Sequence, residues 1–188
     1  AEAVLEEAAK LASGVLAPLN HPGDVQGVRL GPEGVIPADG FARAYQKFVD
    51  GGWNGIGCAI DHGGQGLPEL LNTATQEMWN SANMSFALCP MLNGGAIEAI
   101  NSVGSEAQQA LYLPKMISGE WTGTMNLTES QAGSDLSAVR ARAVPEGDHY
   151  RIFGQKIFIT WGEHNMTDNT IHLVLARTPD APEGVRGI

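Results

Sequence analysis

The stretch MNLTESQAGSD at positions 125–135 decides how the rest of the sequence is read. The residues at 121–127 are apolar enough for a short strand, and the small polar residues that follow favour a turn. A strand that enters a Gly-Ser-Asp turn presents successive backbone N–H groups and hydroxyls from one side. Such a surface suits a pyrophosphate or the polar edge of a flavin ring. The alternative is an ordinary polar loop in which Asp135 bonds its own turn.

A second stretch, GQKIFITWG at 154–162, follows further along the chain. Together the two stretches resemble the flavin-binding middle segment of the acyl-CoA dehydrogenase family, in the family's order and at its separation. The resemblance extends back through most of the preceding residues. The residues at 159–164, 172–177 and 182–188 look most like a larger-sized branch that includes 3-methylmercaptopropionyl-CoA dehydrogenases.

The resemblance implies an FAD-dependent enzyme that oxidises an acyl-CoA thioester to the trans-2,3-enoyl form and passes electrons to an electron-transferring flavoprotein. It also implies that Ser134 contacts the acyl-CoA and that Phe158 lies on the ring where Trp is more typical, which keeps an aromatic face there. The cofactor-binding residues implied in this way are Met125, Leu127, Thr128, Gly133, Ser134, Phe158, Ile159 and Thr160.

No catalytic residue is assigned, because the family's catalytic Glu lies in a C-terminal helical domain. The chain is therefore expected to be a fragment, inactive alone, of a homodimer or homotetramer. Flavin oxidases and monooxygenases of the same architecture, which react with oxygen, are an alternative. A DNA-binding relative is another, but the net charge of −10 disfavours it because duplex binding needs a basic face.

Composition indicates a globular protein, with 43% hydrophobic and 17% charged residues among 188. No apolar run reaches the roughly 18 residues that a membrane-spanning helix needs. Cys58 and Cys89 are the only cysteines, and we expect reduced thiols in a cytoplasmic protein. The histidines lack metal-ligand spacing. His164 follows Glu163 directly, and adjacent side chains seldom converge, so a structural or solvated role is expected.

The fold class expected is α+β, with an all-helical N-terminal domain at 1–120. Apolar spacing predicts helices at 1–19, 39–50, 69–82 and 86–103, with a loop at 20–37. Pro18 and the cluster at 20–23 are predicted to end the first helix. A capping box at Ser105 predicts a short helix through Leu111. Gly94 and Gly95 indicate either close helix packing or a nearby ligand.

An antiparallel, β-barrel-like middle domain is expected at 121–188, truncated before a C-terminal helical bundle. The alternation at 139–143 and 150–152, with a turn at 145–148, predicts a hairpin. Further strands are predicted at 156–161 and 171–176.

Overall fold

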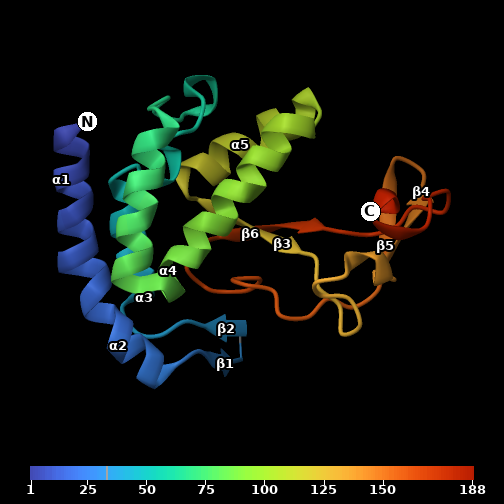
Figure 1. Ribbon diagram of the computed structural model, residues 1–188, viewed down its shortest axis with the longest axis horizontal. Coiled ribbons are helices and arrows are strands. Elements are labelled where there is room, and N and C mark those ends of the chain that lie inside the picture. The colour runs from blue at the N-terminus through green and yellow to red at the C-terminus, as the bar shows by residue number, and fades with distance from the viewer. Residues whose placement is uncertain (33) are drawn as a thin grey trace.

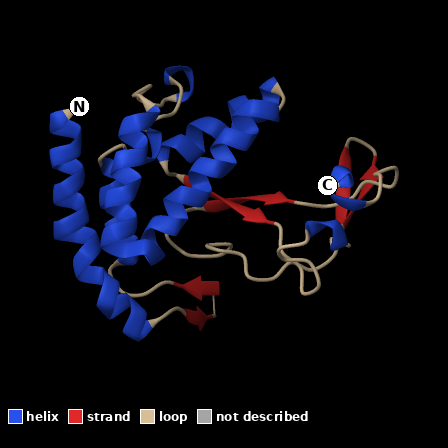
Figure 2. Cartoon of the chain, viewed as in Figure 1, coloured by secondary structure: helices blue, strands red, loops and turns tan. Residues whose placement is uncertain are grey.

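The computed structural model describes residues 1–32 and 34–188 (Figure 1). The α-helices are α1 (Glu2–Leu11), α2 (Ala17–Gln26), α3 (Phe41–Asp50), α4 (Glu69–Val103) and α5 (Glu106–Ser118). The strands are β1 (Arg29–Gly31), β2 (Gly34–Ile36), β3 (Trp121–Asn126), β4 (Arg142–Glu146), β5 (His149–Phe153) and β6 (Asn169–Val174). Helices dominate the first part of the chain and strands with long loops the second (Figure 2), which confirms the predicted order of structure types.

The first helical region runs past the prolines that the sequence predicts to end it. A π-helical turn, Ala12–Leu16, joins α1 to α2, and α2 includes Pro18 and Pro22. Pro18 is the second residue of α2 and directly follows the π-helical turn, and Pro22 lies inside the helix. The helix ends at Gly27, whose φ of 66° favours glycine. The predicted loop at 20–37 is wrong, because it begins in α2 and ends in the β1–β2 hairpin.

The long helix α4 bends at Asn83, between the two helices that the sequence predicts. Asn83 has φ −160° and ψ 89°, which is extended rather than helical backbone. Its side-chain Oδ1 accepts a hydrogen bond from Phe86 N at 3.1 Å, so Asn83 caps the second half of the helix. Its Nδ2 donates to Leu16 O at 3.2 Å, a carbonyl of the π-helical turn. The buried side chain of Asn83 therefore forms hydrogen bonds at both the π-helical turn and the bend in α4.

The last helix, α5, starts at the predicted capping box and ends later than predicted. Gln108 N donates to Ser105 Oγ, and Ser105 N donates to Gln108 Oε1. The helix passes Leu111 and continues through Pro114 to Ser118. Leu113, Met116 and Ile117 are buried in this extension, and their packing outweighs the helix-breaking tendency of proline.

The strands form two-stranded sheets, and within the described residues none closes into a barrel. β1–β2 and β4–β5 are antiparallel, and the latter is the predicted hairpin. β3 and β6, however, pair in parallel, from Trp121↔Asn169 to Asn126↔Val174. The expected antiparallel barrel is therefore not found. Alternating apolar residues identify a strand but not its partner or the direction of pairing.

The predicted strand at 156–161 is also wrong, because this segment is irregular. Phe158 and Trp161 have positive φ values of 60° and 51°, which no extended strand allows. The segment lies beside the residues of β3 and just after it, held by contacts described below.

The strand β3 packs closely against α4 because Gly123 has no side chain. A Cβ atom at position 123 would lie 2.5 Å from Ala96 Cβ and 2.6 Å from Met116 Cε. The buried side chains beside this contact are Ala96, Ile97, Ile100, Leu113, Met116 and Ile117. A separate core joins α1, the π-helical turn, α3 and the part of α4 on both sides of Asn83, including Leu16, Phe41, Phe48, Trp79 and Phe86. In the part of the chain that the structure describes, no helix has the length and apolar character needed to cross a membrane.

Candidate functional site

The structure brings the two sequence motifs side by side. Thr124 Oγ1 donates to Thr160 O at 2.7 Å, and Ile157 N donates to Thr128 O at 3.0 Å. The second motif thus runs along the outgoing end of β3. Both contacts use backbone carbonyls, those of Thr160 and Thr128.

A buried ion pair lies where the motifs meet. Lys156 Nζ is 2.9 Å from Glu129 Oε1 and also donates to Leu127 O at 2.9 Å. Glu129 is 5% exposed and accepts further hydrogen bonds from Arg140 N, Ala141 N and Gln131 Nε2. Burial alone would raise the pKa of Glu129, but these donors outweigh it and lower the pKa to about 2.

Sequence analysis named neither Glu129 nor Lys156 as a site residue and therefore missed their contact. Glu129 and Asp135 are the charged residues of the first motif, at 125–135. Lys156 is the one charged residue of the second motif, at 154–162, and Glu163 follows directly after it. Opposite charges in two motifs that hold only one other charged residue, Asp135, were the available signal.

The residues expected to face a flavin do not all border one cavity. A hollow of about 930 Å³ is lined by Phe158, Ile159 and Thr160 together with Asn126 and Lys156. Phe158 is 83% exposed, so its ring is open to a ligand. Met125 and Leu127 are half-buried, and the methyl of Met125 lies toward Gly95 of α4, 3.0 Å from where a Cβ would stand.

Gly133 and Ser134 are exposed beyond β3. Next to them, Asp135 Oδ1 accepts a hydrogen bond from Ser137 N at 2.9 Å. This is the contact expected if the segment were an ordinary polar loop, the alternative to a ligand-binding turn. Hydrogen bonding by Ser137, from its side chain first and then from its backbone N–H, lowers the pKa of Asp135. The Asp135 carboxylate therefore serves its own turn, while Gly133 and Ser134 remain accessible.

His164 is buried rather than solvated. It is 9% exposed, its Nδ1 accepts from Met166 N at 3.2 Å, and its Nε2 lies 2.9 Å from Thr122 Oγ1. Burial lowers its pKa, so the neutral ring is favoured. Glu163 is exposed and the two side chains do not pair, so the structure supports the structural role expected for His164.

Trp161 connects the second motif to helices α3 and α4. Its indole Nε1 donates to Ser85 O at 2.9 Å, and its ring stacks on Phe41 with centroids 6.2 Å apart. The His164 ring also packs edge-on against the Trp161 ring, with centroids 5.5 Å apart.

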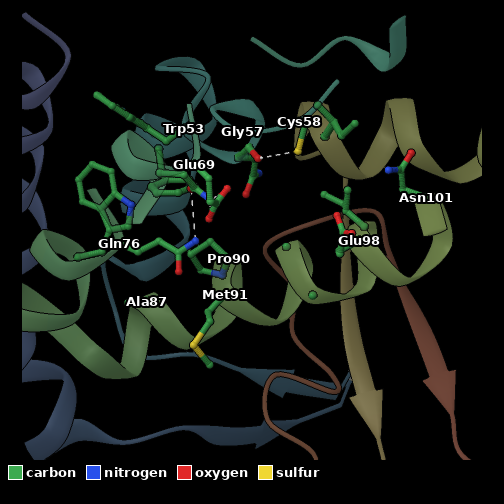
Figure 3. A pocket seen from close by; sticks show the side chains of 18 of the residues that line it. Trp53, Gly57, Cys58, Glu69, Gln76, Ala87, Pro90, Met91, Glu98 and Asn101 are labelled. Carbon is green, nitrogen blue, oxygen red and sulfur yellow. Dashed lines mark hydrogen bonds between the residues drawn. The ribbon is translucent and has the colours of Figure 1, made fainter. Parts of the chain in front are cut away.

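A second cavity, of about 590 Å³, opens among the helices (Figure 3). Met91, Glu98 and Asn101 of α4 line one side, and Cys58 and Glu69 line another. Burial, and then the nearby carboxylates of Glu98 and Glu69, raise the pKa of the Cys58 thiol. Gly94 and Gly95 also border this cavity, and Gly94 has open space above it.

The cysteines and acidic residues suggest no further chemistry. Cys58 and Cys89 are both free thiols, and burial raises the pKa of Cys89 to about 12. Across residues 1–32 and 34–188, no group of three or more His, Cys, Asp or Glu side chains is placed to hold a metal ion.

Comparison with known proteins identifies the family. The family described as "Acyl-CoA dehydrogenase, N-terminal domain" matches residues 1–120, and the chain belongs to it. The chain is 54% identical over its whole length to 3-methylmercaptopropionyl-CoA dehydrogenase of Ruegeria pomeroyi, and it covers 32% of that protein.

Solved structures agree with this assignment. A probable acyl-CoA dehydrogenase of Mycobacterium abscessus is 26% identical, with a TM-score of 0.78 over 99% of this chain and 46% of its own. An acyl-CoA dehydrogenase of Bacillus anthracis complexed with FAD, 22% identical, shares the fold with a TM-score of 0.76 over 94% of this chain and 28% of its own. The chain spans about a third of the length of the curated relatives it matches, 32% and 31% for the first two.

Proposed function

We propose that the chain is part of an FAD-dependent acyl-CoA dehydrogenase, which oxidises an acyl-CoA thioester to its trans-2,3-enoyl form and passes electrons to an electron-transferring flavoprotein. The observation that carries this proposal is the pairing of the two motifs through Thr124–Thr160 and Thr128–Ile157 contacts. Family membership and the similarity to 3-methylmercaptopropionyl-CoA dehydrogenase support it.

The donor set at the motifs fits a flavin. An isoalloxazine ring needs an apolar or aromatic face and hydrogen-bonding groups at its polar edge. Phe158 offers an exposed aromatic face, and Met125 and Leu127 offer apolar side chains. Thr128 and Thr160 would direct their hydroxyls to the ring edge, and Ile159 lines the same cavity as Phe158 and Thr160. Bound FAD would supply the oxidant for the reaction.

The exposed turn at Gly133 and Ser134 suits phosphate groups. Both residues are accessible, and glycine lets a ligand approach the backbone closely. We assign Ser134 to the pyrophosphate and to the neighbouring part of the acyl-CoA. These groups would orient the ligands, and no residue of the chain is assigned as the base that removes the α proton.

The helical cavity offers a place for the acyl group. Gly95 borders that cavity and also adjoins Met125, one of the residues proposed to flank the ring. An acyl chain lying along Gly94 and Gly95 would therefore reach the flavin side of β3. The acidic and amide side chains at the far part of the cavity, including Glu98 and Asn101, disfavour a long apolar chain there.

The test is to express the complete reading frame and to add a panel of acyl-CoA thioesters without oxygen while following the flavin absorbance. Bleaching by one class of thioester is expected and would name the substrate. A bound flavin that no thioester reduces would favour the oxygen-using relatives instead. A protein that binds no flavin would overturn the assignments at Thr128, Ser134 and Phe158–Thr160.

A further inference from the structure

The Lys156–Glu129 ion pair differs from the other ion pairs in the described part of the chain. The Lys156 side chain is 9% exposed and that of Glu129 is 5% exposed. The other pairs between Lys or Arg and a carboxylate, Lys10–Glu7, Arg29–Asp39, Lys115–Glu120 and Arg151–Glu146, all have side chains at least 41% exposed. A buried pair is weak evidence for stability, because removing both charges from water is costly. Its location therefore needs another explanation.

The contacts of the pair give that explanation. Lys156 reaches back to Leu127 O at the end of β3, while Glu129 holds Arg140 N and Ala141 N beyond the turn. Three separate segments, 127–129, 140–141 and 156, are thus bonded to one pair of charges. The next residue, Ile157, donates to Thr128 O, so the pair sets the register of the two motifs.

Charge balance adds a second consequence. Lys156 lines the same cavity as Phe158 and Thr160, and its charge is balanced there by Glu129 at 2.9 Å. Removal of Glu129 leaves the positive charge of Lys156 unbalanced in the cavity wall, and removal of Lys156 leaves the negative charge of Glu129 unbalanced behind that wall. In a poorly solvated site such a charge acts more strongly than it would in water.

We propose that Glu129 and Lys156 are positioning residues of the flavin site: together they fix the spacing of the two motifs and keep the cavity wall electrically neutral. This inference rests on the proposed function. Neither residue is assigned contact with the reacting atoms, and both act through the backbone that carries Thr128, Phe158 and Thr160.

The first experiment measures FAD affinity in the protein from the complete reading frame. The double variant Glu129→Gln/Lys156→Met removes both charges at similar volume, and we expect its apoprotein to bind FAD at least tenfold more weakly. The matched control, Lys115→Met/Glu120→Gln, neutralises an exposed pair with a 3.0 Å separation and should change affinity less than twofold. A folded double variant with wild-type affinity would overturn the proposal.

The second experiment separates electrostatic positioning from simple loss of packing. Glu129→Gln leaves the cation unbalanced and should raise the flavin reduction potential, whereas Lys156→Met should lower it. Each shift is expected to reach a tenfold change in the equilibrium, about 30 mV for a two-electron couple. Shifts of the same sign, or none, would contradict the charge-balancing role.

If the variants that remove Glu129 or Lys156 do not fold, Lys156→Arg tests the positioning role. This variant keeps the positive charge but replaces the compact ammonium group with a planar guanidinium. The guanidinium is not expected to reproduce both hydrogen bonds of Lys156, to Leu127 O and Glu129 Oε1. FAD binding weakened at least threefold supports positioning, and unchanged binding overturns it. A wild-type protein that binds no FAD would instead overturn the proposed function itself, so the two failures are distinguishable.

Discussion

At the scale of residues, His164 shows how a buried polar side chain orders the loop around the second motif. Met166 N occupies its Nδ1, so in the neutral ring the proton is on Nε2, which faces Thr122 Oγ1. Protonation of Nδ1 would remove the acceptor that Met166 N needs. Thr122 is itself within 3.3 Å of Thr170 Oγ1 at the start of β6, so the network joins the loop to both parallel strands.

The stability of the protein should fall in mild acid because of His164. Burial lowers its pKa below the ordinary 6.5, so its contribution is full above 6.5 and is lost as the pH falls toward the folded-state pKa. Between about pH 7.5 and about pH 5, we expect the melting temperature of wild type to fall more steeply than that of His164→Gln. The control is His149→Gln, at a side chain that is 62% exposed. Parallel curves for wild type and His164→Gln would contradict this assignment.

Glu129 should affect stability at lower pH than His164 does, and in the same direction: stability should fall as the pH falls. Its pKa is lowered from 4.5 to about 2, so its stabilisation is full above 4.5 and is lost as the pH falls toward about 2. Urea unfolding of Glu129→Gln should therefore show a weaker loss of stability than wild type below about pH 4.5. An equal loss in both proteins would show that other carboxylates dominate acid unfolding.

At the scale of elements, a side chain provides hydrogen bonds at the irregular points of the helices. The π-helical turn exposes carbonyls that a regular helix would pair, and Asn83 supplies a donor to one of them. The same residue supplies the cap for the second half of α4. Two irregularities that lie far apart in sequence therefore depend on one amide.

Asn83→Ala should destabilise the protein by about 2–3 kcal/mol, because it removes a helix cap worth about 1 kcal/mol and leaves the buried Leu16 carbonyl without its donor. The measurement is the free energy of unfolding from urea titration. Ser81→Ala is a suitable control, since its hydroxyl bonds Glu77 O on the exposed face of the same helix. A loss below about 1 kcal/mol would mean that Asn83 does not act at both ends.

The helices were predictable because their burial follows a local period. Phe41, Tyr45 and Phe48 are buried one turn apart in α3, as their spacing predicts. The parallel β3–β6 pair was not predictable, because it joins residues about 48 positions apart and depends on the loop between them. The irregular course of 156–161 likewise depends on Trp161 binding to Ser85, a contact that no local pattern contains. The candidate site followed from motif resemblance, whereas the Lys156–Glu129 contact required the fold.

At the scale of the whole molecule, a few specific contacts join the helices to the strands. Tyr45 Oη donates to Gly119 O at 3.1 Å, just before β3, and burial raises the pKa of Tyr45. Trp161 joins the second motif to α3 and α4. Gly123 allows α4 to lie directly against β3.

Trp161→Phe should keep the ring contact with Phe41 but lose the hydrogen bond to Ser85 O. We expect a loss of about 0.5–1.5 kcal/mol in unfolding free energy, since one hydrogen bond to the exposed Ser85 is lost. FAD affinity should also fall, because Phe158 and Thr160 are only one to three residues away. Trp121→Phe, at a ring that contacts Lys115 and Tyr112, is the control for loss of an indole. Unchanged affinity would show that the Trp161 anchor is not needed at the site.

The two glycines at positions 123 and 94 should respond to alanine in opposite directions. At 123 the new methyl would meet Ala96 Cβ at 2.5 Å, an atom that moves only with the backbone of α4, so we expect a loss of about 1–3 kcal/mol from overpacking. At 94 the methyl meets nothing within 4 Å, and replacing a glycine in a helix should add about 0.5–1 kcal/mol.

Thermal unfolding of the two variants measures this contrast, and steady-state kinetics adds a functional test. Gly94 borders the 590 Å³ cavity, so Gly94→Ala should raise KM for the acyl-CoA while leaving FAD affinity unchanged. Gly123→Ala should weaken FAD binding, because it displaces the strand that carries Met125 away from α4. If Gly94→Ala leaves KM unchanged, the helical cavity is not where the acyl group lies, because a methyl group added to the cavity wall would contact an acyl chain packed along it.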